Sequence, residues 1–196
     1  MDSLLNSLAG QIDDRTIQQL SAQIGADQHT TQQAVSAALP MLLGALERNT
    51  ASSQGAASLT NALQRDHNGD ILNNLSAALA DPATLQDGIA ILSHVLGPKQ
   101  NNVENGISSF SGLNQNSTGQ LLALLAPVVL GSLGQMQQQH NLNADGVAGV
   151  LQNQRPETES ILGGFAQLLD MDHDGDITDD IITIGSRLLS SWLNKR

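Results

Sequence analysis

The chain has 196 residues, a formal net charge of −11 and no cysteine, and only 2% of its residues are aromatic. A core of Leu, Ala, Ile and Val with so few rings favours packed helices over a sandwich or barrel. The negative charge argues against general binding of nucleic acids, whose phosphates it repels. Residues 1–6 lack the basic region of a signal peptide, and the longest apolar run, 121–131, is shorter than the ~20 residues that span a bilayer. We therefore expect a cytoplasmic protein without a membrane span.

Helix start and stop signals follow one another along the chain, and no stretch shows sustained strand alternation, so the predicted fold class is all-α. Two prolines, Pro40 and Pro127, lie inside predicted helices and are expected to kink or break them. Residues 121–133 are apolar nearly all round and predict a central buried helix or an oligomer interface. The predicted helices cover about 3–10, 14–24, 30–46, 53–64, 70–80, 82–96, 99–111, 117–133, 144–155, 156–169 and 181–192.

The chain also repeats itself. Residues 21–46 match residues 108–133 without a gap, and residues 66–75 match residues 172–181 at five of ten positions. These matches predict a helical bundle built from two related helical units, 1–98 and 99–196, either on one continuous core or as two domains. The residues shared by the longer match are Ser21, Gly25, Gln28, Thr31, Gln33, Pro40, Leu43, Gly44 and Leu46 with their counterparts 87 positions later.

The strongest chemical signal is the acidic loop, residues 170–180, which holds six aspartates and no Lys or Arg. An EF-hand loop takes oxygen ligands at alternating positions, a glycine at the sixth and a bidentate carboxylate near the twelfth. Gly175 fills the sixth position, but Ile181 stands at the twelfth, so closure depends on Asp180 one residue earlier. The alternative is an acidic cap at a helix N-terminus. The predicted structural Ca²⁺ ligands are Asp170, Asp172, Asp174, Asp176, Thr178 and Asp180.

The earlier copy of this loop is a weaker candidate. It offers oxygens from Gln64, Asp66, Asn68 and Asp70, but Leu72, Asn74 and Leu75 follow. We expect a turn and a helix cap there rather than an ion site.

Three stretches together carry a family resemblance. They are Ser-Gly-Leu-Asn at 111–114, Gln-Leu-Leu-Ala-Leu-Leu-Ala-Pro-Val-Val-Leu-Gly-Ser-Leu at 120–133, and the segment 168–180 that contains the acidic loop. In combination they resemble the YidB-like bacterial family, a domain of unknown function. The resemblance implies an all-helical bacterial protein and transfers no activity and no catalytic residue.

These features favour a non-enzymatic, calcium-stabilised structural or protein-interaction module that binds a protein partner or itself. A second hypothesis is nucleic-acid binding, because residues 17–35 have the spacing of a helix-turn-helix. The second helix of this pattern has no Lys or Arg before Arg48, so the required phosphate contacts are missing. A third hypothesis is an enzyme, although the sequence holds no GxSxG, HExxH or phosphate-cradling glycine motif.

Overall fold

The computed structural model describes residues 4–155, so the acidic loop and all six predicted Ca²⁺ ligands lie outside the described residues. The described part consists of helices joined by turns, which confirms the all-α class. A further helix begins at residue 144 and is described as far as residue 155. The elements are α1 (Leu4–Gln11), α2 (Asp14–Ile24), α3 (Gln28–Asn49), α4 (Ser53–Arg65), η1 (Asp70–Asn74), α5 (Leu75–Ala80), α6 (Pro82–Val95), η2 (Gly97–Lys99), α7 (Gln100–Ser111) and α8 (Gln115–His140).

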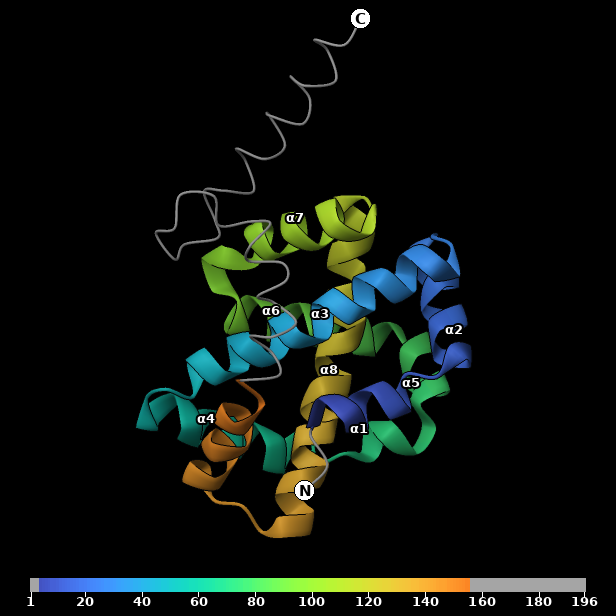
Figure 1. Cartoon of the computed structure of the whole chain (residues 1–196). Helices are drawn as coiled ribbons and strands as arrows, with labels where there is room; N and C mark the ends of the chain where they lie inside the picture. The colour runs from blue at the N-terminus through green and yellow to red at the C-terminus, as the bar shows by residue number, and fades with distance from the viewer. Residues whose placement is uncertain (1–3, 156–196) are drawn as a thin grey trace, which may run out of the picture.

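Helix α8 runs through the middle of the bundle, with the other helices arranged around it (Figure 1). It packs on α1, α2, α3, α4, α6 and α7, and every residue from Leu121 to Gly134 is buried. This confirms the prediction of a central buried helix. Residues from both sides of position 98 share one hydrophobic cluster, among them Leu43 and Leu133. The division into units 1–98 and 99–196 stays a prediction, because the second unit continues beyond residue 155.

Each proline was expected to kink or break its helix, and the break does not occur at either one. Helix α3 continues through Pro40 and α8 through Pro127, and both prolines are buried. A proline inside a helix removes one backbone hydrogen bond, and close packing around both helices holds them continuous. Helix α8 also extends past its predicted end at residue 133. It ends where Asn141 adopts the left-handed conformation (φ 49°) and donates its N–H to the carbonyl of Gln137.

Within residues 4–155, α8 is the one helix that is long and apolar enough to cross a membrane by length and composition. Its 26 residues exceed the short apolar run on which the expectation of no membrane span was based. However, 89% of its most apolar window is buried inside the bundle. That burial is typical of a core helix, whose apolar surface other helices already cover.

The hairpins α2–α3 and α7–α8 begin their turns in the same way. Gly25 ends α2 at φ 68° and Gly112 ends α7 at φ 81°, both in the left-handed region that glycine adopts without strain. Each glycine N–H donates to the carbonyl four residues earlier, on Ser21 and Ser108 respectively.

The second helix of each hairpin also starts in the same way. Asp27 caps α3 and Asn114 caps α8, each accepting the backbone N–H three residues later at 2.9 Å. Thr31 and Thr118, both fully buried, then donate their hydroxyls to the carbonyls of these two capping residues. In addition, α2 packs on α8 and α7 packs on α3, so the two hairpins contact each other reciprocally.

Candidate functional site at the turn between α4 and η1

The described residues contain the earlier copy of the acidic loop, which we call the polar turn (residues 66–72). Helix α4 ends at Arg65, and the N–H groups of Asp66 and His67 both donate to the carbonyl of Ala62, at 2.9 and 3.2 Å. Gly69 follows at φ 100°, a conformation that a residue with a side chain rarely adopts. The chain then turns directly into η1.

The polar turn lies against α8 at two glycines. A side chain at Gly134 would overlap the backbone carbonyl of His67, and a Cβ at Gly131 would lie 2.5 Å from Cγ2 of Ile71. On the other side, a Cβ at Gly69 would lie 2.8 Å from Cβ of Gln135. The absence of side chains therefore lets the turn reach the helix backbone.

The Gly-Ser-Leu-Gly sequence at 131–134 allows another helix to approach closely, but it does not indicate that a turn from the first unit lies there. The sequence held one indication that residues of the polar turn make a specific contact. His67, Gly69 and Ile71, which make these contacts, are all identical in the second copy of the motif.

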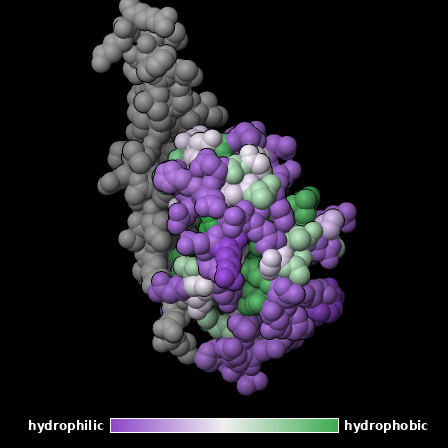
Figure 2. Space-filling view, turned by 90° about the vertical axis from the view of Figure 1, so that its right-hand side faces the viewer, coloured by the Kyte–Doolittle hydropathy of each residue, from purple (hydrophilic) through white to green (hydrophobic). Residues whose placement is uncertain are grey.

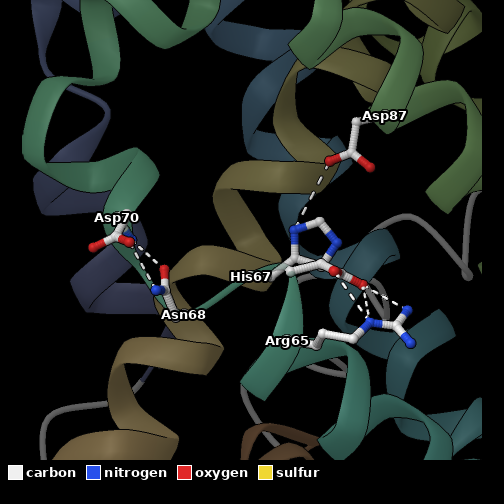
Figure 3. A network of polar contacts seen from close by, with 6 residues as sticks. Arg65, His67, Asn68, Asp70 and Asp87 are labelled. Carbon is white, nitrogen blue, oxygen red and sulfur yellow. Dashed lines mark hydrogen bonds and ion pairs between the residues drawn. The ribbon is translucent and has the colours of Figure 1, made fainter.

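The carboxylates of the polar turn point to different partners (Figure 3). Asp66 pairs with Arg65, with 2.9 Å between Asp66 Oδ2 and Arg65 Nη2, and this hydrogen-bonded pairing lowers the pKa of the Asp66 carboxyl. On the other side of the turn, the Asn68 side-chain amide donates to Asp70 Oδ2 at 2.7 Å, and Asn68 Oδ1 accepts the Asp70 N–H. The Asp66 and Asp70 carboxylates therefore bond to separate partners, Arg65 and Asn68.

His67 lies between the polar turn and α6. Its Nδ1 is 3.8 Å from Oδ2 of Asp87, too far for a hydrogen bond, so the two side chains attract each other only when the imidazole is protonated. They line a hollow of about 270 Å³ whose wall also includes Pro127 of α8. Across residues 4–155, three or more His, Asp or Glu side chains never gather closely enough to hold a metal ion.

A larger groove of about 650 Å³ lies between α4 and α6, with Leu46 and Leu130 among its lining residues. The face of the molecule in Figure 2 is mostly hydrophilic, with small separate hydrophobic spots. Within the described residues, the large hydrophobic side chains that are exposed are Ile89 and Phe110. They lie on different helices, α6 and α7.

The segment with helix-turn-helix spacing forms the α2–α3 hairpin. The start of α3, the position of a recognition helix, buries Thr31, Ala34 and Val35 and exposes Gln32. Its exposed cation, Arg48, lies at the opposite end of α3. None of these observations favours the nucleic-acid hypothesis.

Neither curated proteins nor solved structures gave a match to this chain. A family described as "Bacterial protein of unknown function (DUF937)" matches residues 6–137. The match extends from α1 into the last turns of α8 and does not include the acidic loop. The chain therefore belongs to this DUF937 family of bacterial proteins of unknown function.

Proposed function

We propose that the protein is a non-enzymatic structural or protein-interaction module whose acidic loop is stabilised by a bound Ca²⁺ ion, and that it works in the cytoplasm with a protein partner or a second copy of itself. The observation that carries this proposal is the alternation of Asp170, Asp172, Asp174 and Asp176 around Gly175. Carboxylates spaced in this way provide the oxygen ligands that calcium prefers. Without a cation they would repel one another at short range.

The polar turn supports this proposal. Gly69 adopts a positive φ, and Gly175 stands at the same place in the second copy, where an EF-hand loop needs a glycine for its sharp bend. Asn68, which organises the polar turn, is replaced by Asp174 in the acidic loop. The second copy thus keeps the glycine that permits the turn and has a carboxylate where the first copy has a neutral amide.

We further propose that the two matching hairpins belong to two related helical units of one bundle. The matched glycine caps, capping residues and buried threonines support this proposal, as does the reciprocal packing of α2 on α8 and of α7 on α3. A module of this kind uses its helices as a scaffold and the ion to fix the last part of the chain.

Thermal unfolding of the full chain in calcium, in magnesium and in chelator tests the calcium proposal. At about 100 times the dissociation constant, a ligand that binds only the folded state adds about 2.7 kcal/mol. In a chain of this size that corresponds to a rise in the midpoint of roughly 5–10 °C. The rise should disappear in the double variant Asp172→Ala/Asp174→Ala. A midpoint that is the same in calcium and in chelator would refute the proposal.

A further inference from the structure

We propose that the second copy of the motif docks on the outer face of α3, around Gly44, just as the polar turn docks on α8 around Gly131. The occupant is the segment 172–178 of the same chain. This inference rests on the two related units proposed above, but it does not depend on calcium binding.

The first argument comes from the residues of the turn that contact α8. Three contacts place the polar turn: the carbonyl of His67 on Gly134, Gly69 on Gln135, and the Ile71 side chain on Gly131. The corresponding residues of the second copy are His173, Gly175 and Ile177, and all three are identical. The positions that differ include 68 and 72, which become Asp174 and Thr178. The second copy therefore keeps the docking residues and changes others.

The second argument comes from the helix that would receive the segment. Gly131 on α8 corresponds to Gly44 on α3, and Pro127, which lines the hollow beside the polar turn, corresponds to Pro40. On α8 the positions equivalent to Met41, Gly44 and Glu47 are buried, in part beneath the polar turn. On α3 these three residues form a half-buried stripe, whereas every other residue from 37 to 46 is buried. The stripe is the place where a matching turn would fit.

The third argument comes from the elements that cover each helix. After α3, the chain forms α4 and η1, and both pack on α8. Among elements α1 to α8, α3 packs mainly on α2, α6, α7 and α8, and no counterpart of η1 is among them. Figure 1 shows α3 crossing the front of the bundle. The 41 residues that follow residue 155 (196 − 155) contain the matching motif, so the chain itself supplies an occupant of the right sequence.

One difference between the two helices refines the placement. Glu47 stands on α3 where Gly134 stands on α8. The carbonyl of His173 therefore has less room than the carbonyl of His67, which lies directly on a glycine. The closest approach of the docked segment should be at Gly44, opposite Ile177.

Disulfide trapping tests this docking directly, because the chain has no cysteine of its own. The test variant is Gly44→Cys/Ile177→Cys. The positive control is the described pair Ile71→Cys/Gly131→Cys. The negative control is Ser36→Cys/Ile177→Cys, since Ser36 is an exposed residue of α3 eight positions before Gly44. Mild oxidation is carried out in calcium and in chelator, and bonds within one chain are identified by peptide mass mapping. A disulfide forms where the two Cβ atoms approach to roughly 3.5–4.5 Å.

We expect the test pair to form an intramolecular disulfide at a yield close to that of the positive control and at least about tenfold above that of the negative control. A yield equal to that of the negative control would overturn the proposal. Links formed only between two chains would overturn it as well and would point to a second copy as the occupant.

A second measurement leaves all of residues 4–155 unchanged. In Ile177→Ala, hydrogen exchange of the backbone amides of residues 41–48 should become faster than in the wild type, while exchange of residues 128–135 stays the same. If residues 41–48 exchange at the same rate in Ile177→Ala as in the wild type, the docking is contradicted. This result would count even if the cysteine variants fail to fold. Failure of calcium to raise the melting midpoint would refute only the calcium proposal, since the trapping also runs in chelator.

Discussion

Gly131 and Gly134 show how two residues can set the position of a whole turn. Both lie on the fully buried part of α8, and the polar turn occupies the space that their side chains would fill, with the His67 carbonyl at Gly134 and the Ile71 side chain at Gly131. Single residues also decide where the helices begin and end. Asp13 and Gly25 at the ends of α2 could be predicted from the sequence, because a capping side chain and a left-handed glycine are local features.

The close contact at Gly134 predicts a large effect of one methyl group. Gly134→Ala should lower the free energy of unfolding by about 1–3 kcal/mol, since the new Cβ overlaps the His67 carbonyl and the turn must move away. The matched control is Gly149→Ala, where nothing lies within 4 Å of the new Cβ. That variant should be stabilised by about 0.5–1 kcal/mol. Urea unfolding measures both, and equal effects would show that the contact is looser than described.

The two capping residues Asp27 and Asn114 predict a difference in pH dependence. Hydrogen bonds from the side chain and the backbone of Thr30 lower the pKa of Asp27 below its ordinary value of 3.8. Its contribution to stability is therefore complete above that value and is lost as the pH falls through the lowered pKa. Asparagine performs the same capping role in α8 without titrating.

In Asp27→Asn, stability should accordingly fall less steeply than in the wild type between about pH 5 and about pH 2. Thermal unfolding across this range measures the slope. Two parallel curves would mean that the Asp27 carboxylate adds nothing beyond a neutral cap.

At the scale of helices, the sequence was a good guide wherever a signal is local. The predicted ranges of α2, α4 and α6 agree with the structure to within a residue or so, since explicit caps or stop residues bound them. The predicted alternative of a helix break failed at Pro40 and Pro127, where packing outweighs a local helix breaker. It also failed at the end of α8, because the glutamines after Gly134 are good helix formers and no stop residue occurs before Asn141.

The proposed docking on α3 predicts an effect of Glu47 whose sign depends on the ion. The segment 172–178 would bring several carboxylates close to Glu47, and like charges at short range repel each other. In chelator, Glu47→Gln should therefore slow hydrogen exchange of residues 41–48 by strengthening the docking. In calcium, Glu47→Gln should leave the exchange of residues 41–48 unchanged or make it faster, because the ion attracts the Glu47 carboxylate.

The matched control for Glu47→Gln is Asp87→Asn. Asp87 is the carboxylate on α6 that lies beside His67 of the polar turn, which docks on α8 and not on α3. Its replacement should leave exchange of residues 41–48 unchanged in both conditions. The same response from the two variants would indicate a general charge effect rather than a local one.

For the whole molecule, composition and helix signals were enough to predict the all-α class, and the apolar run at 121–133 predicted the central helix. The partner of Gly131 and Gly134 could not be predicted in the same way, because contacts between distant segments depend on the tertiary arrangement and not on local pattern. The candidate chemistry is concentrated in the acidic loop, whose six aspartates account for more than half of the net charge of −11. That loop lies outside both the described residues and the part matched by the family.

Calorimetric titration of the full chain with calcium tests the central proposal most directly. The matched variants are Asp172→Ala/Asp174→Ala in the acidic loop and Asp66→Asn/Asp70→Asn in the polar turn. We predict that the wild type binds one Ca²⁺ ion per chain, that the first variant loses this binding, and that the second retains it, because Asp66 and Asp70 point to separate partners. No heat of binding for the wild type, or the same binding in Asp172→Ala/Asp174→Ala, would contradict a calcium-stabilised acidic loop.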